Sequence, residues 1–211
     1  MADSNGWLDW YRQRKDSITF SAAAFAVVLL GSFLFIKYRS DRKLEAQELF
    51  SQAQTALKRA PDAAGGNAQA EAEQQLSRVS AEFSDLPLGK PAALYEAEIM
   101  RDRGQFPQAL DRIRRFLGDQ EGKKDLWTAF ARRNEAYYLE LMGQMQEAKQ
   151  AYMMLGEEKW VWISKEELDL GQARCLLGLG QKDAARALLI PISAQKPASY
   201  WTRSAEALLN I

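Results

Sequence analysis

Residues 136–152 read AYYLELMGQMQEAKQAY and hold a pattern that occurs three times in the chain. Two other stretches align with it without gaps, residues 97–113 (AEIMRDRGQFPQALDRI) and residues 173–189 (ARCLLGLGQKDAARALL). Each begins with alanine and has methionine or leucine three residues later and glycine four residues after that. A second alanine follows five residues on, and an apolar residue four residues after it. Self-similarity at a fixed period is the signature of a repeat architecture.

Each stretch predicts an antiparallel pair of helices. In the central stretch, Ala136 is small enough to let a neighbouring helix approach closely, and Leu139 continues the same face. Gly143 stands where a helix commonly ends in the left-handed backbone conformation. Ala148 then marks the crossing of the second helix on the first, and Tyr152 extends that buried face. The surrounding sequence is rich in helix formers and lacks the alternation of strands, so we predict an all-α fold.

The spacing of the stretches predicts the extent of the repeat domain. They begin 39 and 37 residues apart, against about 34 in a standard tetratricopeptide repeat. Because the seventeen-residue cores are equal in length, the extra residues must lie between one pair and the next. A capping box at Ser164 and Glu167 marks one helix start, and Pro197 suits the start of the last helix. Within a domain of residues 41–211 we expect helix pairs at about 41–83 (opened by a joint at 61–69), 91–117, 125–156 and 164–192, then a capping helix at 197–210.

An uncharged apolar segment precedes the repeats. Residues 18–36 read ITFSAAAFAVVLLGSFLFI, and eleven of these nineteen residues are Ile, Leu, Val or Phe. A helix of this length rises about 28 Å, close to the hydrocarbon thickness of a bilayer. Lys37, Tyr38 and Arg39 follow it, where a cleaved signal peptide needs small residues. The chain is also too short to bury an all-apolar helix in a soluble core. We therefore predict one uncleaved transmembrane helix after a short tail, residues 1–17.

The residues that flank this segment fit a membrane interface but leave its orientation open. Trp7, Trp10 and Tyr11 precede it and Tyr38 follows, as in an interfacial aromatic belt. Three basic residues lie on the N-terminal side and four on the other. This difference is too small for the positive-inside rule to decide which side the repeats face.

The composition argues against several classes of function. The 28 basic and 28 acidic residues cancel, so the chain lacks the basic character that nucleic-acid binding usually requires. It has no histidine, the commonest general base and metal ligand. Cys175 is the single cysteine, so it can form neither an intrachain disulfide nor a thiolate metal site, and we expect it to be buried. We predict no bound metal, no cofactor and no enzymatic activity.

The alanine and glycine positions resemble the tetratricopeptide repeat from about Lys43 to Ile211. The order of a short tail, one uncleaved helix and a degenerate repeat domain resembles the ancillary SecYEG translocon subunit (YfgM-type) family, which is related to the cell-division coordinator repeats. The resemblance implies a bacterial inner-membrane scaffold with periplasmic repeats that assists protein export or envelope-protein assembly. Implied partners are translocon subunits, periplasmic chaperones and exported chains. A subunit of another envelope machine, for cytochrome maturation, outer-membrane or cell-division assembly, is an alternative, as is a purely structural tether.

Repeat domains of this kind bind partners on the concave face, which the first helix of each pair lines. If the first alanine is repeat position eight, positions five, nine and twelve face inward. They are Leu94, Glu98 and Arg101 in the first stretch, Arg133, Tyr137 and Glu140 in the second, and Leu170, Arg174 and Leu177 in the third. Tyrosine and arginine are common interface anchors; the alternative interpretation is a set of solvated helix faces.

A second candidate site lies between the second and third stretches. Trp160 and Trp162 belong to the sequence WVWI, residues 160–163. An exposed pair of tryptophans would form a binding patch. We favour the other interpretation, in which they pack beneath the connection.

Overall fold

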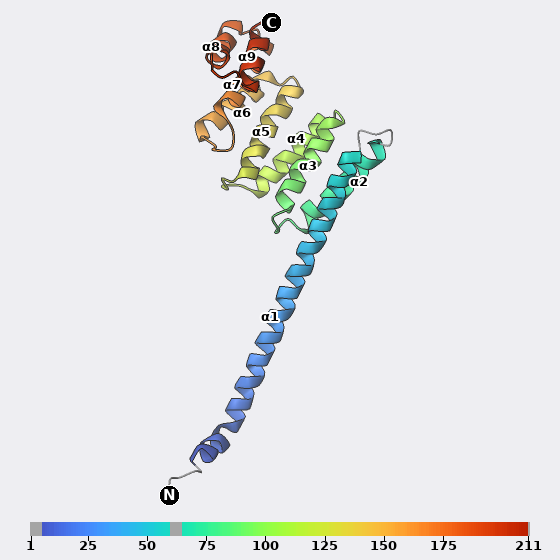
Figure 1. Ribbon diagram of the computed structural model, residues 1–211, viewed down its shortest axis with the longest axis vertical. Helices are drawn as coiled ribbons and strands as arrows, with labels where there is room; N and C mark the ends of the chain where they lie inside the picture. The colour runs from blue at the N-terminus through green and yellow to red at the C-terminus, as the bar shows by residue number, and fades with distance from the viewer. Residues whose placement is uncertain (1–5, 60–64, 211) are drawn as a thin grey trace. The chain divides into compact units, whose positions relative to one another are not determined.

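The computed structural model describes residues 6–59 and 65–210 of the 211-residue chain, and every regular element in that part is a helix (Figure 1). The helices are α1 (Gly6–Arg59), α2 (Gly65–Glu82), α3 (Gly89–Asp102), α4 (Phe106–Asp119), α5 (Leu126–Leu141), α6 (Met145–Glu158), α7 (Lys165–Gly178), α8 (Lys182–Ser193) and α9 (Tyr200–Leu209). The predicted all-α fold class is confirmed. The chain divides into two units, Met1–Glu48 and Leu49–Ile211.

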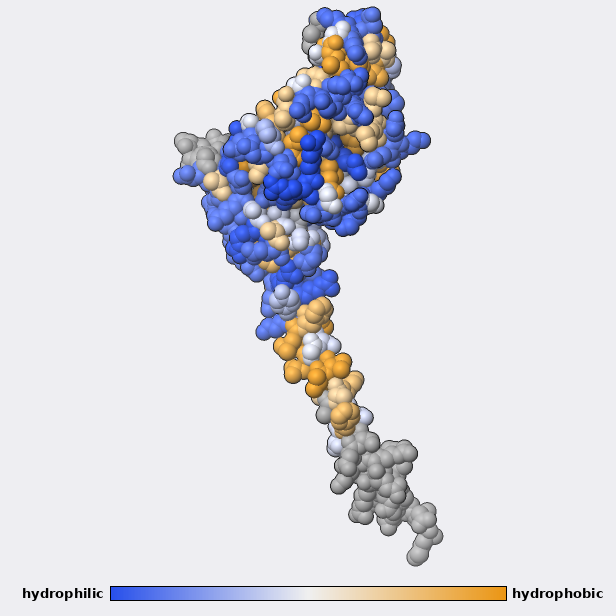
Figure 2. Space-filling model, turned by 180° about the vertical axis from the view of Figure 1, so that it is seen from behind, coloured by the Kyte–Doolittle hydropathy of each residue, from blue (hydrophilic) through white to orange (hydrophobic). Residues whose placement is uncertain are grey.

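The first unit carries the apolar segment on α1. Its described apolar side chains are exposed, from 54% for Leu29 to 77% for Phe20, and Figure 2 shows them as a hydrophobic band along the helix. Within the described residues, this is the one helix long and apolar enough to cross a membrane. None of its apolar window is buried, so it is not the core helix of a soluble domain. A membrane anchor and a signal sequence both fit this finding. The side chains that flank the segment on its N-terminal side lie outside the described residues, as do residues 61–64 of the predicted joint. Residues 65–69 of that joint are not a loop but the first residues of α2.

The second unit is a stack of helices in which each helix from α2 to α8 packs against the next one (Figure 1). We call the first helix of each pair helix A (α3, α5 and α7) and the second helix B (α4, α6 and α8). Contacts also join α3 to α5, and α7 to α9. The helix A members therefore share one side of the stack, and α9 continues that side past the last pair.

Alanine and glycine at the repeat positions have the predicted roles. The alanines at the two repeat positions of each stretch are all 0% exposed; they are Ala97, Ala109, Ala136, Ala148, Ala173 and Ala185. The repeat glycines Gly104, Gly143 and Gly180 end each helix A with φ of 73°, 75° and 73°. An L-residue with a side chain rarely adopts this conformation. Both predictions are confirmed.

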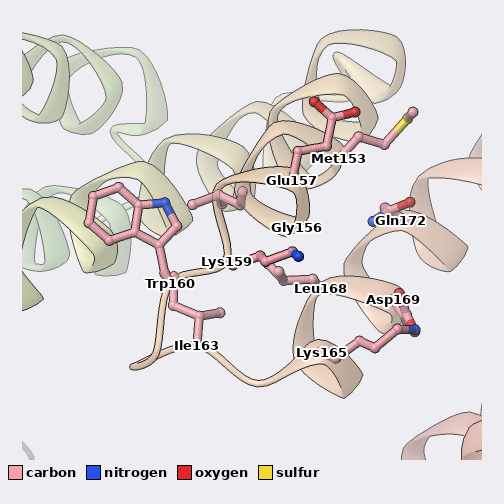
Figure 3. A pocket seen from close by; sticks show the side chains of 11 residues that line it. Met153, Gly156, Glu157, Lys159, Trp160, Ile163, Lys165, Leu168, Asp169 and Gln172 are labelled. Carbon is pink, nitrogen blue, oxygen red and sulfur yellow. The ribbon is translucent and has the colours of Figure 1, made fainter. Parts of the chain in front are cut away.

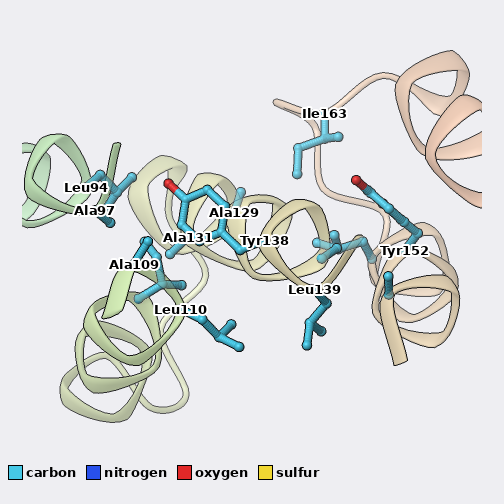
Figure 4. Close-up of a cluster of buried hydrophobic side chains, with 14 of the residues drawn as sticks. Leu94, Ala97, Ala109, Leu110, Ala129, Ala131, Tyr138, Leu139, Tyr152 and Ile163 are labelled. Atoms are coloured by element: carbon cyan, nitrogen blue, oxygen red, sulfur yellow. The ribbon is translucent and has the colours of Figure 1, made fainter. Parts of the chain in front are cut away.

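Two clusters of buried side chains form the core around these alanines. The larger cluster runs from α3 to α7 and includes the fully buried Tyr138, whose ring lies among the alanines of α5 with its hydroxyl toward Leu94 and Ala97 (Figure 4). The smaller cluster joins α7, α8 and α9. Cys175 is 0% exposed, as predicted, and belongs to the larger cluster.

Gly171 of α7 leaves room for the ring of Tyr152 on α6. A Cβ atom at this position would lie 2.6 Å from the ring of Tyr152 on α6, too close for any real side chain. The ring of Tyr152 thus occupies the space that a side chain at residue 171 would need.

Side-chain caps mark the starts of α7 and α9. Ser164 accepts a hydrogen bond from the backbone nitrogen of Glu167 at 3.1 Å, which is one half of the predicted capping box; the carboxylate of Glu167 pairs with Arg133. The final helix begins at Tyr200, because Ser199 and Thr202 form a capping box. Pro197, the predicted start, lies in the connection before it. Serine can accept from the free N–H groups of the first turn, whereas proline supplies no such cap.

The buried alanines yield the first test. Replacement of Ala185 by Leu should lower the free energy of unfolding by about 1–3 kcal/mol, because the added carbons overpack the contact between α7 and α8. Ala184, its neighbour on α8, is exposed, so Ala184→Leu should change stability by less than about 0.5 kcal/mol. Thermal unfolding of the detergent-solubilised chain compares them. Equal melting temperatures for the two variants would show that the crossing face of α8 has been assigned wrongly.

Candidate functional site

A cleft of about 540 Å³ lies on the side of the stack formed by helix A members and α9. We call it the main cleft. Its lining residues are Arg101, Arg133, Asn134, Tyr137, Glu140, Leu141, Tyr152, Glu167, Arg174, Tyr200 and Trp201. Five of the nine predicted site residues are among them. The main cleft therefore crosses from α3 over α5 and α7 to the cap, over three successive repeats.

A smaller cleft of about 240 Å³ adjoins the main cleft between α3 and α5. We call it the side cleft. Its lining residues are Pro91, Leu94, Tyr95, Glu98, Trp127, Phe130, Arg133 and Asn134. Arg133 and Asn134 line both clefts. Together the two clefts contain seven of the nine predicted residues.

Leu170 and Leu177 line neither cleft. Leu170 is 1% exposed and belongs to the core cluster of α7, α8 and α9, and Leu177 packs against the same cluster. These two leucines are covered because α9 packs on α7, at the end of the stack where the helix A members stop. Leu94, at the same repeat position as Leu170, is also mostly buried, at 6% exposed, although one side of it reaches the side cleft.

Charged side chains in the main cleft are largely paired with one another. Arg174 donates two hydrogen bonds to Glu140, at 2.6 Å from Nε and 2.9 Å from Nη2. The hydroxyl of Tyr152 donates to the same carboxylate at 3.0 Å. Burial, followed by the charge of Glu140, raises the pKa of Tyr152 far above its ordinary value, so the phenol stays protonated. Glu140 thus joins α5, α6 and α7 at one point.

The other two arginines of the main cleft also have partners. Arg133 donates to Asn134 Oδ1 at 2.8 Å and to Glu167 at 3.4 Å. Arg101 pairs with Asp102 at 2.7 Å. The pairs Arg133–Glu167 and Glu140–Arg174 each span 34 residues and join α5 to α7. Arg133 and Arg174 therefore stabilise the stacking of neighbouring repeats, a role that neither interpretation from the sequence included, whereas the partner of Arg101 lies on the same helix.

A carboxylate and a buried amide at the clefts are among the groups without a partner within the described residues. Glu98 has no hydrogen bond or ion pair there, and the Nδ2 atom of the buried Asn134 has no acceptor. Burial raises the pKa of the Glu98 carboxyl, and the nearby guanidinium groups of Arg101 and Arg133 offset only part of this effect. Both Asn134 and Tyr95 stand two residues before a repeat alanine. This is repeat position six, which directly follows position five, the first position predicted to face inward. The prediction from the sequence did not include it.

A third cleft, of about 540 Å³, lies where α6 connects to α7. We call it the connection cleft; Trp160, Ile163 and Leu168 form its apolar wall (Figure 3). Trp160 is 8% exposed and its indole donates to Glu158 at 2.6 Å, so the favoured packing role is confirmed for this residue. Trp162 differs, because 44% of it is exposed, and the intervening Val161 is 84% exposed.

Comparison with known proteins supports the architecture. A family model described as a tetratricopeptide repeat-like domain matches residues 9–132, more than half of the chain. The chain belongs to this family. Among curated proteins, none matches it significantly.

Solved structures share the fold at low sequence identity. A crystal structure of nearly identical TPR-like repeats, from a kinesin light chain candidate of Podosopora anserina, has a TM-score of 0.60 at 15% identity and covers 78% of this chain and 84% of that one. A variant of those repeats with one glutamine replaced by methionine has a TM-score of 0.62 at 17% identity with the same coverage. A tetratricopeptide repeat protein of Parabacteroides merdae has a TM-score of 0.54 at 17% identity and covers 76% of this chain and 59% of that one.

The Glu140–Arg174 pair yields the second test. Arg174→Met keeps the aliphatic stem but leaves a mostly buried carboxylate without its main donor, which should cost about 1–3 kcal/mol of stability. Arg101→Met removes an arginine from the same cleft whose partner, Asp102, is exposed, and should cost less than about 1 kcal/mol. Chemical denaturation of both variants measures the difference. Equal losses would mean that the pair at Glu140 does not hold the repeats together.

Glu98 yields a test by pH. Since its pKa is raised in the folded chain, the folded state binds this proton more tightly than the unfolded state does. Stability must therefore fall as the pH rises from about 4 through the raised pKa. Glu98→Gln should raise the melting temperature at pH 7 and remove this part of the pH dependence. The measurement is thermal unfolding of both chains between about pH 4 and pH 7. A variant that melts lower than the parent at pH 7 would indicate that ionised Glu98 has a stabilising partner.

Proposed function

We propose that this chain is a scaffold that binds other proteins in the main cleft. The supporting observation is that three successive repeats and the cap together line this cleft, and that it presents Tyr137, Tyr200 and Trp201 beside arginines. Tyrosine, tryptophan and arginine dominate the binding energy of protein interfaces. The volume of the cleft also falls within the range of ligand-binding sites. We assign no catalytic role, because the family is one of repeat scaffolds.

We further propose that α1 anchors the scaffold in a bacterial inner membrane, with the repeats in the periplasm. The exposed apolar window of α1 supports the anchor. The family match begins at residue 9, so it includes the apolar segment together with the repeats. Assistance to protein export or envelope-protein assembly is the role we propose for the anchored scaffold; it rests on the resemblance to the ancillary translocon subunits.

Photo-cross-linking in native membranes tests the binding role. A photoreactive phenylalanine in place of Tyr137 should give discrete cross-linked proteins, because this residue lines the main cleft. The same group at Gln108, an exposed residue of α4, serves as the matched control and should give none. Mass spectrometry of the products would then identify export or assembly components. Cross-links from Trp162 but not from Tyr137 would move the binding site to the exposed connection between α6 and α7, and none from either position would favour a purely structural tether.

A fusion of alkaline phosphatase after Ile211 tests the proposed orientation on the same membranes. The phosphatase should be active, because the enzyme matures only outside the cytoplasm. Recovery of the intact N-terminus in the membrane fraction should accompany it. An inactive fusion would place the repeats in the cytoplasm, and a mature chain that begins beyond residue 36 would identify the segment as a signal sequence.

A further inference from the structure

The side cleft has the size of a site for one side chain rather than for a whole ligand. Its volume of about 240 Å³ is smaller than the roughly 300–1,000 Å³ of small-molecule sites. It opens beside the main cleft, with which it shares Arg133 and Asn134. A partner chain that lies in the main cleft could therefore place one of its side chains here.

Three aromatic rings form the walls of the side cleft. Tyr95 is 37% exposed, and an edge contact with Phe50, at 5.8 Å between ring centroids, holds its ring. Trp127 and Phe130 are one turn apart on α5 and meet edge to face at 6.5 Å. Aromatic faces attract cations within about 6 Å of the ring centroid. The cleft already shows this preference, since the guanidinium of Arg133 lies 5.3 Å from the centroid of Phe130.

Glu98 supplies the charge of the side cleft. Asp102 pairs with Arg101, and Glu167 pairs with Arg133. Glu98 and Arg133 are the two charged residues that line the side cleft, and Arg133 is paired with Glu167, so the carboxylate of Glu98 is the charged group of this cleft that has no partner within the described residues. Its burial disfavours the ionised form. An unpaired carboxylate lowers the stability of the free protein, and a ligand with a hydrogen-bond donor can supply the missing partner.

The desolvation of Glu98 determines which side chain fits. Any occupant of the side cleft removes water from this carboxylate. An apolar side chain would leave the charge buried without compensation, which is costly. A lysine or arginine side chain would instead place its aliphatic stem against Tyr95 and Trp127 and its charge at Glu98.

We propose that Glu98, Tyr95 and Trp127 form a subsite for one cationic side chain, lysine or arginine, of a bound protein partner. This proposal rests on the proposed scaffold function and adds what the scaffold selects. The side cleft excludes acidic side chains, which Glu98 repels, and gives the repeat domain a preference for a basic residue at one point of its partner.

Fluorine NMR of the detergent-solubilised full chain tests the subsite. The six tryptophans are replaced by 5-fluorotryptophan, and Trp127→Phe identifies the signal of Trp127. The probes are the peptide acetyl-Gly-Ala-Arg-Ala-Gly-amide and its counterpart with citrulline, which has the shape of arginine without its charge. The arginine peptide should shift the Trp127 signal in a saturable manner, and the citrulline peptide should bind at least about tenfold more weakly.

Two variants complete the test. Glu98→Gln should reduce binding of the arginine peptide to the level of the citrulline peptide. Glu206→Gln removes an exposed carboxylate on α9 and should leave binding unchanged. Equal binding of the two peptides, an unaffected Glu98→Gln variant, or no shift with millimolar arginine peptide would each overturn the subsite. Cross-linking at Tyr137 that persists in Glu98→Gln would show that the scaffold function stands when the subsite fails.

Discussion

The distance at which neighbouring helices can touch governs the rest of this structure. Ala136, Ala148 and their equivalents carry one side-chain carbon each, so the helix backbones approach closely at these points, and Gly171, which carries none, leaves room for an aromatic ring. Tyr152 then fills the space over Gly171 and reaches Glu140 with its hydroxyl. A larger residue at any of these contacts would separate the helices and displace the groups that line the main cleft. Close packing on the buried side of each helix therefore determines the positions of the polar side chains on its open side.

The polar side of the helix A members is held by a different kind of contact. Ion pairs such as Arg133–Glu167 and Glu140–Arg174 join equivalent helices of successive repeats. They leave the main cleft rich in charge but nearly neutral, because its arginines and carboxylates compensate one another. Such a surface stays open to water instead of closing on an apolar core. Binding in the main cleft must then depend on shape, whereas the side cleft beside it offers Glu98, a charged group left unpaired within the described residues.

The sequence predicts the packed side of the repeats better than the open side. The roles of Ala173 and Gly180 could be predicted because the first position accepts only a small residue and the second requires a positive φ. Both requirements recur at the same spacing along the chain. Arg174 could be assigned to the helix A side, but not to Glu140, because the two residues lie on different repeats and their pairing depends on the offset between helices. Leu170 was expected in the binding face, and the contact of α9 with α7 buries it. Trp160 and Trp162 share one motif, yet only the three-dimensional path of the connection separates a buried ring from an exposed one.

The division of the core into two clusters has a consequence for how the domain opens. α7 contributes Leu168 and Cys175 to the larger cluster and Leu170 and Leu176 to the smaller one. In a stack where helices contact mainly their neighbours, stability is close to a sum of local interfaces. The α8–α9 end can thus detach as a unit while α3 to α6 stay folded, since α7 is the helix that both of these clusters share. Backbone amides of α8 and α9 would then exchange with solvent before those of α5, which lies inside the larger cluster, and each opening would remove Tyr200 and Trp201 from the lining of the main cleft.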